Sequence, residues 1–287
     1  MMYFCADDYG LNSVTSARIR TCVQKNALNK VSVFTNFESP DLLPLFENNL
    51  RLSLHLNLVE GTCVANPDQL GLIVDENGRF KHTFGGLFKL ALTSGNLLEE
   101  QAYQEIRAQV LLWKKHLPPN VPFCIDSHQH TYMIPPIFKA VVRVLQDEKI
   151  SVSYMRIPAE PLSPYIKTPS LYFTYKLVNL IKQWLLKFLW LLDKKYLSNT
   201  HIPTAHFCGI LFSGKMDADR LIKILPKYMA LSKKDGKDVE VLFHPGYLEK
   251  HEINFEDQHI PFKEFYASEN RKIEFDSVIK LSERSML

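Results

Sequence analysis

Seven short β-like runs, separated by helical patterns, constrain the fold of this chain more than any other feature. In chain order they are YFCA, KVSVFTNF, RLSLHLNL, PFCIDSH, SVSYMRI, HFCGILFS and VEVLFHPG. The clearest helical pattern lies at 98–117, where apolar residues recur at spacings of three and four. Strands that alternate with helices are typical of a parallel sheet or barrel. The sequence therefore predicts an α/β fold with about seven parallel strands.

The length of the chain, 287 residues, suits one α/β barrel or two ordinary domains. Because no internal repeat or low-complexity linker divides it, we expect a single domain over 1–287. Within it we expect a long excursion at about 61–95 and a helical insertion at about 168–197. The formal net charge of +3 is too small to indicate binding to nucleic acid.

The cysteines and the N-terminus bear on the cellular location. Five cysteines, with no CxxC pair and no short repeated spacing, indicate reduced thiols. Asp7 and Asp8 interrupt the N-terminus before the apolar region of a signal peptide could form. We therefore expect a cytoplasmic protein, either free or peripheral at the inner face of the membrane.

Side chains capable of chemistry lie where the predicted strands end. They are Asp7, Asp8, His55, Asn57, Asp126, His128, His130, Arg156 and His244. The carboxyl ends of parallel strands line a common pocket, which is where barrel enzymes place their sites. One carboxylate and two imidazoles can hold a metal ion and leave positions open for water and substrate. The pattern predicts a metal site, although any one of these histidines alone would more often be an ordinary core or surface residue.

The adjacent Asp7 and Asp8 end the first strand, where neighbouring side chains point to opposite faces. One of them must therefore point inward, and a buried carboxylate is paired, hydrogen-bonded or bound to a metal. The alternative is that Asp8 caps the helix that begins near Asn12. His128 and His130, two residues apart, are expected on one face of a strand.

Four motifs carry a resemblance to a known family. ADDYGLN, HLNLVEGT, IDSHQHTYMIPP and VLFHPGY occur in this order, over roughly Tyr3 to Tyr247. Together they resemble the YdjC-like carbohydrate deacetylases, a group that includes chitooligosaccharide deacetylase and the hopanoid-associated deacetylases. The resemblance implies a distorted (β/α) TIM-like barrel that uses a divalent metal ion to remove acetyl groups from N-acetylated sugars.

The resemblance also implies roles for individual residues. Asp8, His55 and His128 match the metal ligands, Asp7 matches the general base and His244 matches the general acid. In this scheme Asp7 takes a proton from water activated by the metal, and His244 protonates the departing amine. The resemblance points to Mg²⁺, whereas two imidazoles and one carboxylate suit Zn²⁺.

Three further residues are candidates for substrate binding, namely Arg156, Asn57 and His130. The planar fork of Arg156 either binds substrate or braces a carboxylate. A structural ion pair between Arg156 and Glu160 is a further alternative.

Two other functions compete with deacetylation. A metal-dependent phosphoesterase could use the same barrel, but the chain has no Gly-rich phosphate cradle and no second carboxylate cluster. An inactive sugar-binding protein would need neither Asp7 nor His244. For a deacetylase, the expected substrate is an N-acetylated sugar, with lipid-linked or cell-surface glycan precursors among the candidates.

The most apolar segment, at about 171–196, reads LYFTYKLVNLIKQWLLKFLWLLDKKY. Lysines interrupt it too often for a transmembrane helix. Wound as a helix, its polar residues gather on one side and leave a wide apolar face. We expect this face to be covered by the barrel or by a second subunit of a homo-oligomer. The alternative is peripheral membrane contact, because lysines with Trp184 and Trp190 suit an interfacial helix.

Overall fold

The computed structural model describes residues 1–37, 41–48, 50–198, 200–252 and 263–284. Its strands are β1 (Met2–Tyr9), β2 (Lys30–Val33), β3 (Arg51–Leu56), β4 (Phe123–Ser127), β5 (Val152–Met155), β6 (His206–Cys208) and β7 (Val239–Phe243). Its α-helices are α1 (Ser13–Gln24), α2 (Leu43–Glu47), α3 (Phe84–Thr93), α4 (Gly95–His116), α5 (Pro135–Asp147), α6 (Ser163–Ile166), α7 (Leu177–Asp193), α8 (Ala218–Asp235), α9 (Lys263–Tyr266) and α10 (Glu269–Ser282). Short 3-10 turns are η1 (Pro67–Gln69), η2 (His128–Met133), η3 (Pro169–Leu171), η4 (Lys194–Leu197) and η5 (Lys250–Glu252).

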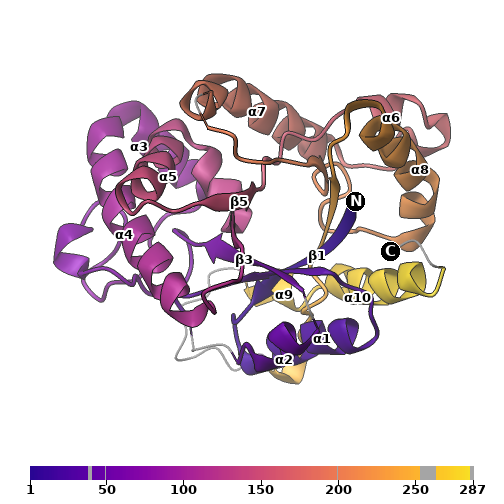
Figure 1. The fold of residues 1–287 in the computed structure, drawn as a ribbon, viewed down its shortest axis with the longest axis horizontal. Helices are drawn as coiled ribbons and strands as arrows, with labels where there is room; N and C mark the ends of the chain where they lie inside the picture. Colours follow the sequence, from indigo (N-terminus) through magenta and orange to yellow (C-terminus); the bar gives the residue numbers. More distant parts are fainter. Residues whose placement is uncertain (38–40, 49, 199, 253–262, 285–287) are drawn as a thin grey trace.

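The seven strands form one sheet in the order β5-β4-β3-β2-β1-β7-β6, and every neighbouring pair is parallel. The sheet curls into a partial barrel, with the helices around its outside (Figure 1). This TIM-like α/β fold confirms the prediction of about seven parallel strands. Strands β5 and β6 are the two edges, and α7 lies in the connection between them.

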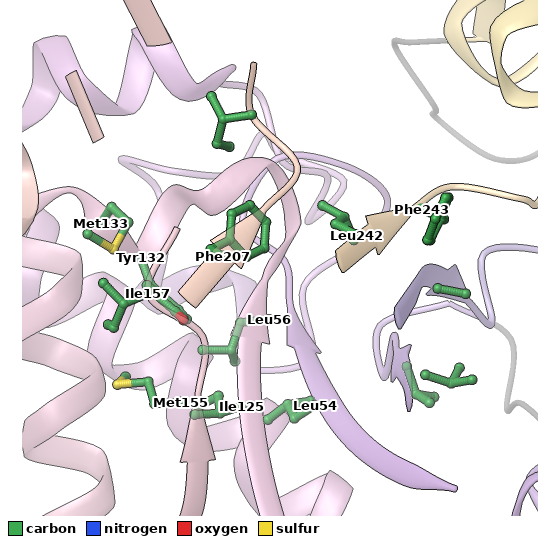
Figure 2. Close-up of a cluster of buried hydrophobic side chains, with 14 of the residues drawn as sticks. Leu54, Leu56, Ile125, Tyr132, Met133, Met155, Ile157, Phe207, Leu242 and Phe243 are labelled. Atoms are coloured by element: carbon green, nitrogen blue, oxygen red, sulfur yellow. The ribbon is translucent and has the colours of Figure 1, made fainter. Parts of the chain in front are cut away.

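Side chains of the strands and of the turn after β4 fill the apolar interior of the curled sheet. Figure 2 shows Leu54, Ile125 and Met155 from neighbouring strands close to one another, each at most 1% exposed. The five cysteines are free, and four of them are buried. Since parallel strands covered on both faces are apolar along most of their length, the polar residues stand out where the strands end.

A distortion at the end of β1 explains how two adjacent aspartates can serve one site. The pairing of β1 with β2 shifts between Ala6 and Tyr9, and Asp8 has a φ of 72°. An irregularity of this kind breaks the alternation of side chains along a strand. Asp7 and Asp8 therefore both face His55, with carboxylate oxygens 3.8 Å and 3.6 Å from its Nε2, and both are buried, at 2% and 0% exposure. The helix cap is Asn12, which accepts from the Thr15 amide, so the capping role considered for Asp8 is wrong.

The chain leaves β4 earlier than its sequence pattern indicates. β4 ends at Ser127, and the turn η2 begins with His128. Within this turn Gln129 and His130 have φ values of 50° and 57°, in the left-handed region. The prediction that His128 and His130 share a strand face is therefore wrong. The turn nevertheless brings both imidazoles to the same pocket.

Candidate active site

The carboxyl ends of the strands open into a cavity of about 360 Å³. Four of the residues identified from the sequence line it: Asp7, His128, His130 and His244. Other parts of its wall come from α7, through Lys182, Leu185 and Leu186, and from the C-terminal helices, through Phe265, Tyr266 and Arg271. Polar groups of the barrel thus form one wall and largely apolar side chains form the others.

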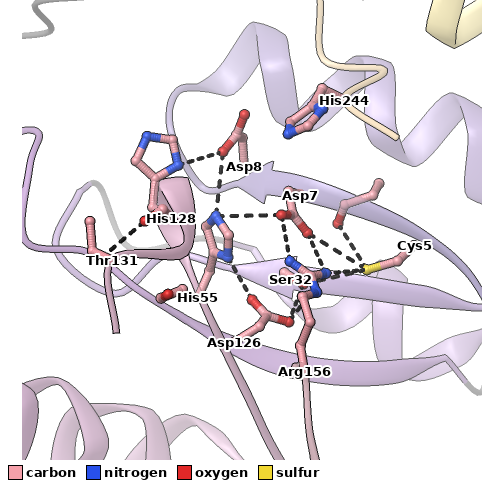
Figure 3. Close-up of polar contacts among 12 residues, drawn as sticks. Cys5, Asp7, Asp8, Ser32, His55, Asp126, His128, Thr131, Arg156 and His244 are labelled. Atoms are coloured by element: carbon pink, nitrogen blue, oxygen red, sulfur yellow. Dashed lines mark hydrogen bonds and ion pairs between the residues drawn. The ribbon is translucent and has the colours of Figure 1, made fainter. Parts of the chain in front are cut away.

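Asp8, His55 and His128 form a buried group of metal-ligand type, with their ligand atoms all within 4.8 Å of one another. Asp8 Oδ1 lies 3.6 Å from His55 Nε2 and 3.2 Å from His128 Nδ1. Metal–ligand bonds of about 2.1 Å at tetrahedral angles would place ligand atoms about 3.4 Å apart. Asp8 Oδ1 and His55 Nε2 are buried without a hydrogen-bond partner. The three residues therefore fit a divalent ion (Figure 3).

In each of these three residues, the side-chain atom that does not face the other two contacts a charged side chain. That contact can fix the orientation of the residue. Asp126 Oδ1 lies 2.6 Å from His55 Nδ1, and Glu60 Oε1 lies 3.6 Å from His128 Nε2. Arg271 donates to Asp8 Oδ2 at 2.6 Å. Carboxylates behind metal-binding histidines fix the ring orientation and raise the basicity of the ligand. The arrangement predicts that His55 binds through Nε2 and His128 through Nδ1.

The buried charges around this group are unbalanced. Five carboxylates face three cations, and none of the eight side chains is more than 2% exposed; they are Asp7, Asp8, Glu60, Asp126, Glu240, Lys30, Arg156 and Arg271. This excess of negative charge favours the binding of a cation. Burial lowers the pKa of His128, but Glu60 and Asp8 outweigh it and raise that pKa to about 10. Protonated imidazoles would supply part of the missing charge when no ion is bound.

A second group of metal-ligand type, Asp7, His55 and Asp126, shares His55 with the first. Asp126 Oδ2 lies 3.2 Å from Lys30 Nζ and 3.4 Å from an Arg156 nitrogen. Two buried cations beside one carboxylate leave little electrostatic attraction for a metal ion there. The first group therefore fits a metal ion better than the second.

Arg156 braces Asp7, which is one of the roles considered for it. Its guanidinium donates to Asp7 Oδ2 at 2.7 Å and to Asp7 Oδ1 at 2.8 Å, and it also contacts Glu240. Burial raises the pKa of Asp7, but Arg156 outweighs it, so that pKa is lowered. Arg156 is 0% exposed. Glu160 accepts from the backbone amides of 209–211, so the ion pair considered between Arg156 and Glu160 does not form.

In Figure 3 the ring of His244 lies above Asp7, and both residues line the pocket. His244 Nδ1 lies 3.3 Å from Glu274 Oε2, and the His244 backbone amide donates to the same oxygen at 2.7 Å. Glu274, on α10, thus fixes the orientation of the His244 ring through a contact with Nδ1. His244 is half-buried and lines the pocket. This arrangement leaves Nε2 as the nitrogen available for proton transfer.

The remaining predicted residues, Asn57 and His130, differ in their surroundings. Asn57 Oδ1 accepts from the amides of Val59 and Glu60, and its Nδ2 donates to the Glu60 carbonyl and to Asn36. Its side chain is therefore fully used in shaping the turn that carries Glu60. His130 lines the pocket, and burial together with Arg156 lowers its pKa to about 3. A neutral imidazole at this position is suited to hydrogen bonding.

Sequence reasoning missed three residues that contact Asp8, His128 or His244: Glu60, Arg271 and Glu274. Glu60 follows the end of β3 closely, so its place after a strand end was a usable signal. Arg271 and Glu274 lie on α10, beyond the motifs, three residues apart and hence on one helical face. Arg271 contacts Asp8 and Glu274 contacts His244. Helix α10 therefore supports both the metal-ligand group and the predicted general acid.

We expect Glu60→Gln to weaken metal binding about 10–100-fold, as loss of an orienting partner typically does. The substitution removes one negative charge and the carboxylate behind His128 Nε2. Metal affinity can be measured by competition with a chelating dye. Glu100→Gln, at an exposed carboxylate on α4, is the matched control. Equal affinity in wild type and Glu60→Gln would remove Glu60 from the site.

Comparisons with known proteins agree with the motifs. A family model described as YdjC-like protein matches residues 1–287. A carbohydrate deacetylase of Danio rerio is 29% identical over 159 residues, and one of Xenopus laevis is 31% identical over 157 residues. Each match covers 54% of this chain and 49% of the relative, so the chain spans about half the length of the curated relatives it matches.

A solved structure resembles the whole fold. It is a candidate cellobiose-phosphate cleavage protein from Enterococcus faecalis, matched over 100% of this chain and 95% of that chain. The TM-score is 0.63 and the sequence identity is 14%. At this identity the likeness concerns the fold alone.

Proposed function

The chain belongs to the YdjC-like family, and from this premise we propose that it is a carbohydrate N-deacetylase that requires one divalent metal ion. The observation that carries the proposal is the buried group Asp8, His55 and His128, beside a pocket that Asp7 and His244 also line. The curated relatives named carbohydrate deacetylase support the reaction class.

The proposed ligands are Asp8 Oδ1, His55 Nε2 and His128 Nδ1. A divalent ion held there would supply a Lewis acid for the hydrolytic water and for the acetamide carbonyl. Two imidazoles with one carboxylate favour Zn²⁺, and Mg²⁺ remains the choice suggested by the family resemblance.

Asp7 and His244 divide the proton transfers between them. Because Arg156 keeps Asp7 ionised, Asp7 can accept a proton from the hydrolytic water. His244, held through Nδ1 by Glu274, can donate a proton from Nε2 to the departing amine. The amide nitrogen leaves readily only when protonated. The proposal therefore requires an ionised Asp7 and a protonated His244 in the same molecule.

The pocket carries groups that suit a neutral acetamide sugar. His130 offers a hydrogen bond to the sugar, while Leu185 and Leu186 offer apolar contact. We include lipid-linked and cell-surface glycan precursors among the substrates, because α7 exposes an apolar face next to this pocket.

Acetate release tests the proposal. Protein loaded separately with Zn²⁺ and with Mg²⁺ is incubated with N-acetylglucosamine oligomers and with nucleotide- and lipid-linked N-acetyl sugars. We expect free acetate and free amine in equal amounts from at least one of them, and at least ~100-fold slower release from Asp7→Asn. A phosphorylated sugar is assayed in parallel. Phosphate release without acetate would favour the phosphoesterase, and sugar binding without either product would favour the inactive binding protein.

A further inference from the structure

Helix α7 presents its apolar face to the outside of the fold. Seven large apolar side chains, each between 42% and 72% exposed, follow one another at helical spacing; they are Leu177, Val178, Ile181, Trp184, Phe188, Leu191 and Leu192. We call them the α7 face. Phe173, just before the helix, is 98% exposed. In Figure 1 the helix lies on the outside of the ring of strands. Contiguous apolar surface of this kind marks an interaction site.

Polar residues hold the helix in this orientation. Asn179 donates to the carbonyls of Leu211 and Ser213, and Gln183 donates to the carbonyl of Glu160. Both side chains are buried, as is Asp193 at the end of the helix. Turning the apolar face inward would break these hydrogen bonds and leave buried carbonyls without donors. The exposure of the α7 face is therefore built into the fold. The barrel covers only part of the apolar residues of the helix, among them Leu186 and Leu189, so the expectation that it covers the whole apolar face is wrong.

The exposed charges of the chain segment that carries the α7 face have one sign. Between residues 163 and 197 the sequence contains six lysines and one acidic residue, Asp193. The lysines are exposed, whereas Asp193 is buried at 0%. Lys187 Nζ lies 5.7 Å from the Trp184 ring, so a cation accompanies the aromatic anchor. Lysine stems that flank apolar and aromatic residues can extend their charges toward an anionic layer.

A second copy of the chain is a poorer partner for this surface. A twofold interface would bring the same lysine-rich surface against itself. The one acidic residue of the segment is buried, so it cannot pair with the partner's lysines. An anionic lipid layer satisfies both the apolar side chains and the lysines.

The α7 face also borders the candidate active site. Leu185 and Leu186, in the same turns as Trp184 and Phe188, line the pocket together with Lys182. A membrane in contact with the outer face of α7 would therefore lie beside the pocket. No helix of the described residues is long and apolar enough to cross a bilayer.

We propose that the α7 face docks on an anionic membrane surface and brings the pocket to N-acetyl sugars carried by lipids. The choice of substrate rests on the proposed deacetylase function, whereas the docking itself does not. Trp184 and Phe188 insert at the boundary between headgroups and acyl chains, and Lys176 and Lys187 contact anionic headgroups.

Sedimentation with vesicles tests the docking. We expect wild type to pellet with vesicles of phosphatidylcholine mixed with phosphatidylglycerol, and far less with phosphatidylcholine alone. The Trp184→Glu, Phe188→Glu double variant should bind at least ~10-fold more weakly, because two carboxylates oppose insertion. Leu92→Glu with Leu97→Glu, at exposed apolar positions on α3 and α4, is the matched control and should pellet like wild type. Thermal unfolding of all variants verifies that they are folded.

Two results would overturn the docking. One is a wild type that stays in the supernatant with both kinds of vesicle. The other is a stable dimer of wild type that Trp184→Glu, Phe188→Glu converts to monomer, since the α7 face would then be a protein interface.

Rates of deacetylation on vesicle-borne and soluble sugars distinguish the docking proposal from the proposed deacetylase function. The double variant should lose at least ~10-fold of its rate on a vesicle-borne N-acetyl sugar and keep its rate on a soluble one. Vesicle binding without acetate release from any substrate would refute the deacetylase function and leave the docking intact. Equal rates of both proteins on the vesicle-borne sugar would refute the lipid-linked substrate.

Discussion

His128→Ala and His55→Gln are each expected to lose the bound metal ion and the deacetylase activity together. Each substitution removes one of three ligands, and the two that remain hold a divalent ion poorly. Glutamine is chosen at position 55 because its amide can still donate to Asp126, which would otherwise lose its His55 partner. Metal content after gel filtration and acetate release are the two measurements.

The control for this pair is His201→Ala, at an exposed histidine outside the pocket. It should retain both metal and activity. Thermal unfolding distinguishes loss of a ligand from loss of the fold. Stoichiometric metal in both ligand variants would refute the assignment of Asp8, His55 and His128.

Asp7→Asn and His244→Ala should behave differently, keeping the metal ion and losing most turnover. Neither residue is a proposed ligand, and removal of a general acid or base typically costs about 10²–10⁴ in rate. Asp7→Asn also removes one carboxylate from Arg156, which keeps its contacts with Glu240 and Asp126. Metal content and initial rates under saturating metal separate the two effects. Loss of metal in Asp7→Asn together with its retention in Asp8→Asn would mean that the two aspartates have exchanged roles.

The pH dependence of the wild-type rate belongs to the same expectation. The rate should fall at low pH, when Asp7 takes up a proton, because a protonated carboxyl cannot accept the proton of the hydrolytic water. Since Arg156 lowers the pKa of Asp7, the acidic limb should lie below the range of an ordinary aspartate. Arg156→Lys, which removes the planar fork, should move this limb to higher pH. A flat profile with chemistry shown to be rate-limiting would contradict this role of Asp7.

The sequence allowed the fold and the centre of the site to be predicted for a physical reason. Buried parallel strands are apolar along their length, so His55 and Asp126, which pair across β3 and β4, stood out at strand ends. Because parallel strands end at one side of the sheet, residues distant in sequence could be placed together. The four motifs then supplied individual roles.

Other features depended on contacts that no local pattern contains. Arg271 reaches Asp8 across more than 260 positions of the chain, from a helix without a motif. The left-handed backbone at Gln129 and His130 follows from the end of β4, which the alternating pattern did not reveal.

For helix α7 too, the amphipathic sequence pattern alone did not predict which side chains are buried. Its sequence pattern separates polar from apolar residues, but which residues are buried also depends on the carbonyls of Leu211, Ser213 and Glu160, which belong to other segments. These carbonyls accept hydrogen bonds from Asn179 and Gln183. The helix therefore buries these two polar residues together with Leu186 and Leu189, and exposes its lysines together with the α7 face.

The most direct test of the central claim is anomalous diffraction from crystals of the protein grown with Mn²⁺ or Zn²⁺, recorded above and below the absorption edge of the metal. The account predicts one anomalous peak at about 2.0–2.3 Å from Asp8 Oδ1, His55 Nε2 and His128 Nδ1. A peak held by Asp7 and Asp126 instead would contradict this assignment, as would a metal-saturated crystal without a peak at these three residues.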